Sequence, residues 1–235
     1  MRGQFEEEIA GQGYSFVPAV EMEAVLRRQG ALEDWTEFGS SWDALPVDEY
    51  MADHGRYRRR RHAVFAVTAA GSVSRLPPQP HFQSLDYNRL NGGIERWFEP
   101  VAPDFADGPS LAAILEFCTD LFGRLGGKGA WHVEVHQFRI EALPGVEASP
   151  TPEGMHRDGV DYVLVLLVHR HNIDSGTTMI GTAADGFFSS FTLTRPFDAA
   201  LVDDHRVFHG VTPVQPIDAS APAYRDVLVV TYRRS

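Results

Sequence analysis

The sequence of 235 residues predicts a mainly β protein with flanking helices, of the α+β class. Two observations support this class. Beyond about residue 130, short apolar runs alternate with Gly, Pro, Asn and Asp, which is typical of the strands and turns of a β-sandwich or barrel. Before that point, helical and strand patterns are mixed. We therefore expect one domain over 1–235, with a mixed part at 1–130 and a β-rich part at 131–235.

The first half contains the patterns of two helices and one strand. Glu21 to Gln29 is expected to be a short helix, and Arg58 to Ala69 a strand, because its basic run gives way to five consecutive apolar residues. Leu111 to Leu125 predicts the clearest helix, since its apolar residues recur at helical spacing. Ser110 is a candidate N-cap for this helix, and Gly126-Gly127 ends it. We expect such helices to pack against the outside of one sheet.

The second half contains six candidate strands, each bounded by turn residues. They are Trp131–Glu141, Asp161–His169, Thr177–Thr182, Phe187–Leu193, Ala200–Val202 and Val227–Tyr232. No second long helical pattern interrupts them, so alternating βαβ units are not expected.

The charge balance argues against several classes of partner. The chain has 21 basic and 32 acidic residues and a net charge of −11, whereas a general polyanion binder needs a basic surface. We therefore expect no nucleic acid as a partner, and we expect the run Arg58 to Arg61 to be a solvated face of its strand. Small molecules are the expected partners.

Cysteine usage and hydropathy predict the cellular location. The single cysteine, Cys118, excludes an internal disulfide framework and a multi-cysteine zinc site, and its place on an apolar helix face favours buried packing. Met1 to Ala10 lacks the apolar region of a signal peptide, and no apolar window approaches the ~18 residues of a membrane span. We expect a cytoplasmic protein with no membrane partner.

His156 and Asp158 form a candidate metal-binding pair. They are two residues apart, so in extended backbone both side chains leave the same face and can reach one point. An H-x-D tripeptide alone is common by chance, but a third ligand is available about 50 residues downstream, at His205 or His209. Two histidines and one carboxylate on one side of an iron leave open positions, which oxygen-activating Fe(II) sites require.

Arg225 opens the apolar run from Asp226 to Tyr232, sixteen positions after His209. A lone arginine at the start of a strand is usually a solvated strand end. Facing a metal pocket, its planar guanidinium would instead form a bidentate pair with a dicarboxylate co-substrate.

Longer motifs around these residues resemble a known family. They are Asn88–Arg96, Val135–Arg139, His156–Asp161, Arg170–Ile173, Gly176–Thr178, His209–Pro213 and Tyr224–Leu228. Together they are similar to the bacterial 2-oxoglutarate/Fe(II)-dependent dioxygenases, in the family that includes the L-isoleucine 4-hydroxylases, which act on a free amino acid. The resemblance extends over about Arg56 to Arg233.

This resemblance implies a double-stranded β-helix, also called a jelly roll, of the cupin-like kind. It implies that His156, Asp158 and His209 are the catalytic residues that hold the Fe(II) ion. His209 is favoured over His205 because Gly-Val-Thr-Pro follows it, as in the family. Arg225 would bind the distal carboxylate of the co-substrate 2-oxoglutarate, and ascorbate is the expected reductant in vitro.

The implied activity is hydroxylation of an unactivated carbon of a free aliphatic L-amino acid, such as isoleucine, leucine or methionine. O2 is the second substrate, and 2-oxoglutarate is converted to succinate and CO2. Two alternatives stay open. The same chemistry could act on a modified amino acid of a biosynthetic pathway, or the chain could be a non-catalytic jelly-roll module that binds a metal or a small molecule. The oligomeric state is open as well.

Three polar residues near these motifs are further candidates for contact with the substrate or co-substrate. Gln137 could contact the co-substrate or the substrate, or could be a polar residue at a strand edge. Arg139 shares the face of Gln137 by alternation and could pair with a substrate carboxylate. Asp161 could bind a substrate amine or cap a turn.

Overall fold

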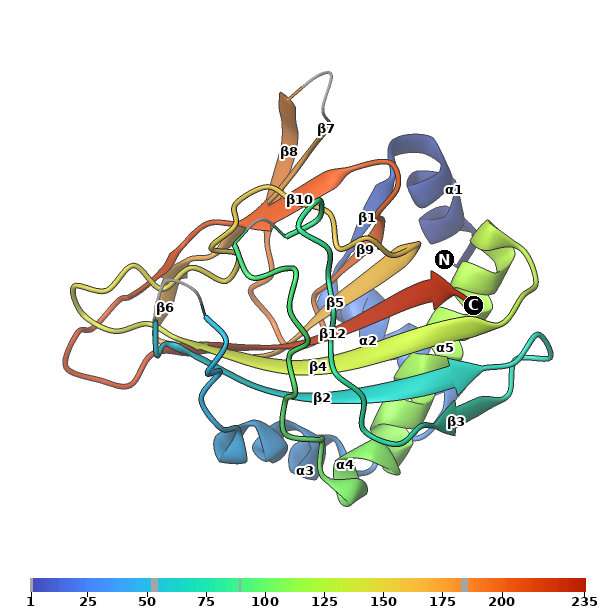
Figure 1. Cartoon of the computed structure of the whole chain (residues 1–235), viewed down its shortest axis with the longest axis horizontal. Helices are drawn as coiled ribbons and strands as arrows, with labels where there is room; N and C mark the ends of the chain where they lie inside the picture. Colours follow the sequence, from blue (N-terminus) through green and yellow to red (C-terminus); the bar gives the residue numbers. More distant parts are fainter. Residues whose placement is uncertain (1, 52–54, 89, 183–185) are drawn as a thin grey trace.

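The computed structural model describes residues 2–51, 55–88, 90–182 and 186–235. Within these residues, seven antiparallel strands form the larger sheet, in the spatial order β1-β9-β5-β12-β4-β2-β3 (Figure 1). The strands are β1 (Tyr14–Val17), β2 (Arg58–Val67), β3 (Val73–Arg75), β4 (Trp131–Glu141), β5 (Tyr162–His171), β9 (Ala199–Asp203) and β12 (Tyr224–Arg234).

Two smaller sheets complete the β structure, in the orders β10-β7-β8 and β11-β6. Their strands are β6 (Ile173–Ser175), β7 (Thr177–Thr182), β8 (Gly186–Thr192), β10 (Phe208–Val211) and β11 (Val214–Pro216). After β5 the chain leaves the larger sheet for β6, β7 and β8 of the smaller sheets and returns to it in β9. It then forms β10 and β11 of the smaller sheets before it returns to the larger sheet again in β12. This alternation between sheets gives a double-stranded β-helix, and the predicted mainly β jelly roll is confirmed.

The predicted strands differ from the observed ones chiefly where polar residues interrupt the apolar pattern. Trp131–Glu141 and Thr177–Thr182 have the predicted bounds. β12 is longer than predicted, because it pairs continuously with β4, from Tyr224 opposite Glu141 to Arg234 opposite Trp131. The strands that the sequence did not predict, β1, β3, β6, β10 and β11, have four residues or fewer, which is too short to show a period.

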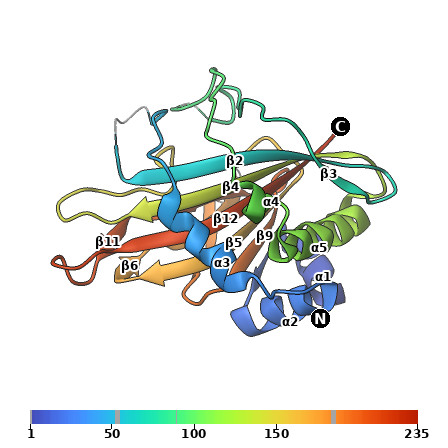
Figure 2. The ribbon, with the colours of Figure 1, turned by 90° about the horizontal axis from the view of Figure 1, so that it is seen from below.

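Three helices cover one face of the larger sheet: α1 (Arg2–Gln12), α2 (Ala19–Gln29) and α5 (Pro109–Gly126) (Figure 2). The core lies between these helices and the sheet, and it includes the alternate β4 residues Trp131 and Val133. The predicted packing of helices on the outside of one sheet is confirmed. Cys118 of α5 is buried and free, as predicted.

The start of α5 differs from the prediction. Gly108 is the N-cap and Pro109 the first helical residue, so Ser110 lies inside the first turn. The backbone N–H and the hydroxyl of Ser110 both donate to Oδ1 of Asp34. The N-cap prediction was wrong because proline, with its fixed φ, favours the first helical position one residue earlier.

The remaining elements are α3 (Trp35–Ser40), the 3-10 helix η1 (Ser41–Ala44) and α4 (Pro103–Ala106). The segment between β3 and α4, green in Figure 1, crosses the face of the sheet opposite the helices. Among the described residues, no helix combines the length and hydrophobicity that a membrane crossing needs.

The arginine run of β2 is not the solvated face that we expected. Arg58 and Arg60 are buried on the face opposite the helices. Arg58 Nε donates to Oδ2 of Asp48 at 2.8 Å, and the Arg60 guanidinium carbon lies 3.6 Å from the ring centroid of Phe98. The Asp48 carboxylate and the Phe98 ring thus replace water around the guanidinium groups of Arg58 and Arg60.

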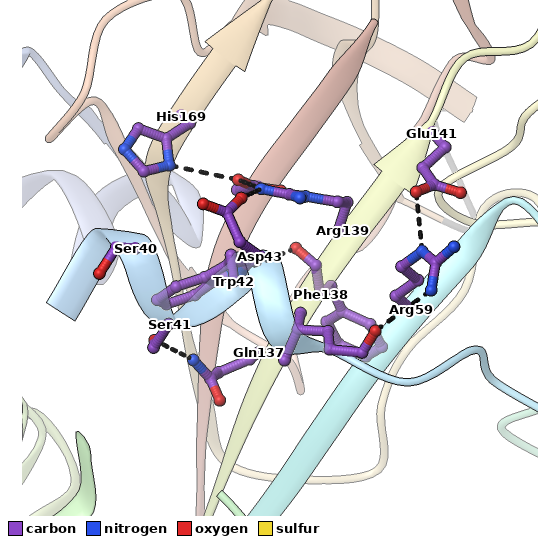
Figure 3. A network of polar contacts seen from close by, with 12 residues as sticks. Ser40, Ser41, Trp42, Asp43, Arg59, Gln137, Phe138, Arg139, Glu141 and His169 are labelled. Carbon is purple, nitrogen blue, oxygen red and sulfur yellow. Dashed lines mark hydrogen bonds and ion pairs between the residues drawn. The ribbon is translucent and has the colours of Figure 1, made fainter. Parts of the chain in front are cut away.

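A buried ion pair lies on the helix-covered face of β4 (Figure 3). Arg139 donates from Nε and Nη2 to the two carboxylate oxygens of Asp226, at 2.7 and 2.8 Å. Asp226 is completely buried, and its second partner is His169, whose Nδ1 lies 3.2 Å from Oδ2. Arg139 Nη2 also donates to Asp43 of η1 at 2.8 Å, so the pair connects η1 to the sheet.

We predict that Arg139→Ala lowers the free energy of unfolding by about 3–5 kcal/mol, because it leaves the buried Asp226 carboxylate without its main partner. The matched control is Arg59→Ala on the neighbouring strand, whose half-buried pair with Glu141 is worth about 1 kcal/mol or less. Urea unfolding of both variants measures the difference. Equal losses would contradict the special role of the buried pair.

Candidate active site

A cavity of about 440 Å³ lies on the face of the larger sheet opposite the helices. Side chains at every second position of a strand leave the same face, so four neighbouring strands contribute alternate residues. They are Arg58 and Arg60 of β2, His132, Glu134, His136, Phe138 and Ile140 of β4, Val163 and Val165 of β5, and Arg225, Val227, Val229, Thr231 and Arg233 of β12. The segment between β3 and α4 also lines the cavity, with residues that include Gln83 and Arg96.

The structure brings His156, Asp158 and His209 together at this cavity. The backbones of His156 and His209 are paired, each N–H donating to the carbonyl of the other at 2.9 Å. Nε2 of His156 lies 3.5 Å from Asp158 Oδ1, and Nε2 of His209 lies 3.4 Å from Asp158 Oδ2. One donor atom from each residue lies within 4.8 Å of the other two, so the three side chains converge on one point.

A backbone carbonyl orients His156. Its Nδ1 lies 3.0 Å from the Gly154 oxygen, which can only accept, so Nδ1 carries a proton and Nε2 is the atom that can offer a lone pair to a metal. Burial lowers the pKa of His156, but the hydrogen bond and charge of Asp158 outweigh burial and raise it to about 9. Burial likewise raises the pKa of Asp158, but hydrogen bonds from His156 and His209 hold it well below its usual range.

Gln83 positions the Asp158 carboxylate, and the sequence analysis did not identify it. Its side-chain oxygen accepts from Asn88 Nδ2 at 3.1 Å and from Arg96 Nη2 at 2.9 Å. With two donors on the oxygen, the amide nitrogen is directed to Asp158 and donates to Oδ1 at 3.2 Å. Gln83 lies in a long segment without periodicity, outside the motifs of the family resemblance, so no sequence signal indicated it.

Asp204 holds the turn that follows the first two candidate ligands. Its buried carboxylate accepts the backbone N–H groups of Asp158, Gly159 and Val160, at 2.9, 2.8 and 3.2 Å. Gly159 has a φ of +78°, and a Cβ there would lie 2.7 Å from the ring of Tyr87. Only glycine adopts this positive φ without strain and also leaves room for the Tyr87 ring, so the turn after Asp158 requires glycine at position 159.

Arg225 is 2% exposed and reaches the cavity from β12. Its Nε and Nη2 have no hydrogen-bond partner among the residues that the structure describes. Burial, with the charge of Arg170 adding to it, lowers the pKa of the guanidinium to about 10. Arg225 is therefore a buried cation with two free donors at neutral pH, and a carboxylate is its chemical complement.

His205 lies outside this group. Its side chain is 69% exposed, and its Nε2 lies 3.2 Å from Oδ1 of Asp161. The other oxygen of Asp161 accepts the backbone N–H of Arg234 at 2.8 Å. Both carboxylate oxygens of Asp161 thus contact distant parts of the chain, and Asp161 does not line the cavity, which argues against a role in binding a substrate amine.

Gln137 and Arg139 lie on the face of β4 that is turned away from the cavity (Figure 3). Gln137 donates to the Ser41 hydroxyl at 2.7 Å, and Arg139 is held by Asp226. The interpretations in which these two residues bind substrate or co-substrate were wrong. They were predicted correctly to share a face, but that face is the helix-covered one.

The polar β4 residues of the cavity are the even-numbered ones, which the sequence analysis also missed. The signal was present, because apolar residues at 131, 133 and 135 mark the odd-numbered positions as the core face. His132, Glu134 and His136 therefore had to point to the other side.

The residues at the cavity fit a ferrous ion and a dicarboxylate. Two imidazoles and one carboxylate converge from one side, which is the donor set of oxygen-activating Fe(II) sites with open positions. The free donors of Arg225 lie in the wall of the same cavity and offer a place for a carboxylate.

Two curated proteins have similar sequences, one of them over nearly the whole chain. The 3(1)-hydroxy-L-isoleucine 4-dioxygenase of Pantoea ananatis (strain AJ13355) is 24% identical over 242 residues, covering 99% of this chain and 96% of that protein. The L-isoleucine-4-hydroxylase of Bacillus thuringiensis is 28% identical over 156 residues, covering 65% of this chain and 64% of that protein.

Solved structures are similar as well. A bsmA homolog from Methylobium petroleophilum PM1 has a TM-score of 0.90 and 36% identity, covering 100% of this chain and 93% of that one. IDO from Bacillus thuringiensis has a TM-score of 0.82 and 20% identity over the full length of both chains. The family model described as 2OG-Fe dioxygenase matches residues 39–231, a range that includes His156, Asp158, His209 and Arg225. This chain therefore belongs to the 2OG-Fe dioxygenase family.

Proposed function

We propose that this protein is an Fe(II)/2-oxoglutarate-dependent hydroxylase of a free aliphatic L-amino acid. The observation that carries the proposal is the convergence of His156, Asp158 and His209 in the same cavity as the unpaired Arg225 guanidinium. Membership of the family implies Fe(II) as cofactor and 2-oxoglutarate as co-substrate. The curated relatives, whose names refer to isoleucine and hydroxyisoleucine, support an amino acid as substrate.

His156, Asp158 and His209 would hold the iron. Bound Fe(II) supplies the activation of O2 that couples oxidative decarboxylation of 2-oxoglutarate to hydroxylation of a carbon. The chain contributes orientation. The Gly154 carbonyl keeps the proton of His156 on Nδ1, and Gln83 fixes the rotation of the Asp158 carboxylate.

Arg225 would bind the distal carboxylate of 2-oxoglutarate through Nε and Nη2, in a bidentate pair. Beside Arg225 and the candidate metal ligands, valines of β5 and β12 give the cavity an apolar wall. Such a wall excludes water from the reacting carbon and is complementary to an aliphatic side chain.

A second candidate is the same chemistry on a modified amino acid. The relative that aligns with 99% of this chain is named for 3(1)-hydroxy-L-isoleucine, which is a hydroxylated amino acid. We also infer a cytoplasmic location, since the single cysteine is free and a ferrous enzyme suits a reducing compartment.

We predict that the protein, incubated in air with Fe(II), ascorbate and 2-oxoglutarate, adds one oxygen atom to at least one free aliphatic L-amino acid. Mass spectrometry of a panel with isoleucine, leucine, methionine and hydroxyisoleucine detects the product, and succinate is measured in parallel. His156→Ala is the control and should form neither the hydroxylated product nor succinate. Turnover of hydroxyisoleucine alone would favour the second candidate. Iron binding without succinate on any panel member would contradict the first candidate and favour a non-catalytic jelly-roll module.

We predict that His209→Ala loses about 100-fold or more in iron affinity and in succinate formation, because a metal ligand is removed. His205→Ala is the matched control and should keep both, since His205 is exposed and outside the cavity. Iron content after dialysis and the rate of succinate release measure the two effects. The reverse pattern would identify His205 as the ligand.

We predict that Arg225→Ala raises the KM for 2-oxoglutarate, with a loss of about 2–5 kcal/mol in co-substrate binding. Iron affinity should change little, because Arg225 is not a proposed ligand. Arg225→Lys should fall between, since an ammonium keeps the charge but not the bidentate geometry. Titration of 2-oxoglutarate and of the metal in each variant gives these values. Unchanged co-substrate affinity in Arg225→Ala would refute this assignment.

A further inference from the structure

Four histidines surround Glu134 of β4, and three of them, His81, His132 and His136, line the cavity together with Glu134 and the candidate metal ligands. Oε2 of Glu134 lies 3.2 Å from His62 Nε2, 2.5 Å from His81 Nδ1 and 3.3 Å from His136 Nε2, and Oε1 lies 3.3 Å from His132 Nε2. Burial raises the pKa of Glu134, but hydrogen bonds from the four histidines outweigh it and hold the pKa well below its usual range. The side chain is therefore a carboxylate whose charge and position are fixed.

Donor atoms of His62, His81, Glu134 and His136 lie within 4.8 Å of one another, but the hydrogen bonding of this cluster argues against a second metal centre. Glu134 Oε2 lies within hydrogen-bond distance of three imidazole nitrogens and can accept a hydrogen bond from each. Arg60 Nη2 also lies 2.7 Å from His136 Nδ1. Because arginine only donates, His136 Nδ1 accepts and the proton lies on Nε2, facing Glu134. A metal-bound imidazole has the opposite arrangement, as His156 does.

The glutamate retains capacity for one more donor. A carboxylate oxygen has two lone-pair directions, and among the described residues the hydrogen-bond partner of Oε1 is His132. The Glu134 side chain is 14% exposed and lines the cavity, so a ligand there can reach it. A fixed anion in a partly apolar cavity is complementary to a small cation.

The register of the sheet relates Glu134 to the strand that follows the turn of Asp158. Thr231 of β12 is opposite Glu134 on one side and opposite Val163 of β5 on the other. Two strand spacings amount to about 10 Å. Val163 lies at the start of β5, which follows the turn that carries Asp158. Glu134, the candidate metal ligands and the valines of β5 and β12 all line one cavity of about 440 Å³, which is room for a small amino acid in contact with each of them.

We propose that Glu134 binds the ammonium group of the amino-acid substrate, and that the histidines around it orient its carboxylate for this contact. The inference rests on the proposed function and adds the group that would distinguish an amino acid from a simple carboxylic acid. Glu134 is in this respect a determinant of substrate specificity.

The test compares Glu134→Gln with the wild type on two substrates. One is the best amino acid of the panel, and the other is its analogue without the amino group. Glutamine has the same shape but turns an uncharged NH2 group toward the ammonium. We expect kcat/KM for the amino acid to fall by about 30-fold or more, as for truncated buried charge pairs. The analogue should change less than about 3-fold, because it lacks the ammonium.

Glu141→Gln is the matched control, since it makes the same change on the same strand and outside the cavity. Thermal unfolding, iron content and the KM for 2-oxoglutarate show whether Glu134→Gln is intact. Glu134→Asp keeps the charge and moves it back by one methylene, so it should lose part of the preference for the amino acid. This variant keeps the proposal testable if Glu134→Gln is unstable.

Three results would overturn the inference. Equal losses on both substrates would make Glu134 a structural residue, and no loss on either would exclude the contact. A second equivalent of bound Co(II) that disappears in Glu134→Gln but not in Glu141→Gln would make the cluster a metal site. If the wild type itself hydroxylates no amino acid, the proposed function fails first and the inference falls with it.

Discussion

The antiparallel pairing of β12 with β4 and β5 determines which side chains of these strands, Arg225 and Glu134 among them, face the cavity. Because side chains alternate along a strand, odd-numbered residues of β12 face the cavity, and the even-numbered Leu228, Val230 and Tyr232 pack against the helices. The same register gives β4 a core face and a polar face. A slip of one residue would exchange the two faces and move Arg225 into the apolar core.

A second constraint joins parts of the chain that are distant in sequence. The backbone pair between His156 and His209 connects the segment before β5 to β10. The Asp204 carboxylate holds the turn at Asp158 by accepting its backbone N–H groups. Gln83 contributes from a third segment, which covers the cavity. The geometry of the candidate metal ligands is therefore supported by backbone contacts and by a side chain from outside the β-helix.

Long periodic elements were the most predictable from sequence. The bounds of β4 followed from its alternation, and α5 from its helical spacing, although its first turn did not. His156, Asp158, His209 and Arg225 were predicted as site residues from their spacing together with a family resemblance, and the structure brings them to one cavity. Gln83 could not be found, because its role depends on tertiary contacts of an irregular segment. The burial of Arg58 and Arg60 was missed for a related reason, since Asp48 compensates them from another part of the chain.

The unpaired guanidinium of Arg225 has a consequence for folding stability. A buried cation without a counter-charge costs free energy in the folded state, and that cost is removed when an anion occupies the cavity. A dicarboxylate that binds the native chain alone therefore raises the unfolding free energy by RT ln(1 + [L]/Kd). Cellular supply of the dicarboxylate would then influence how much folded protein persists, as well as how fast it turns over.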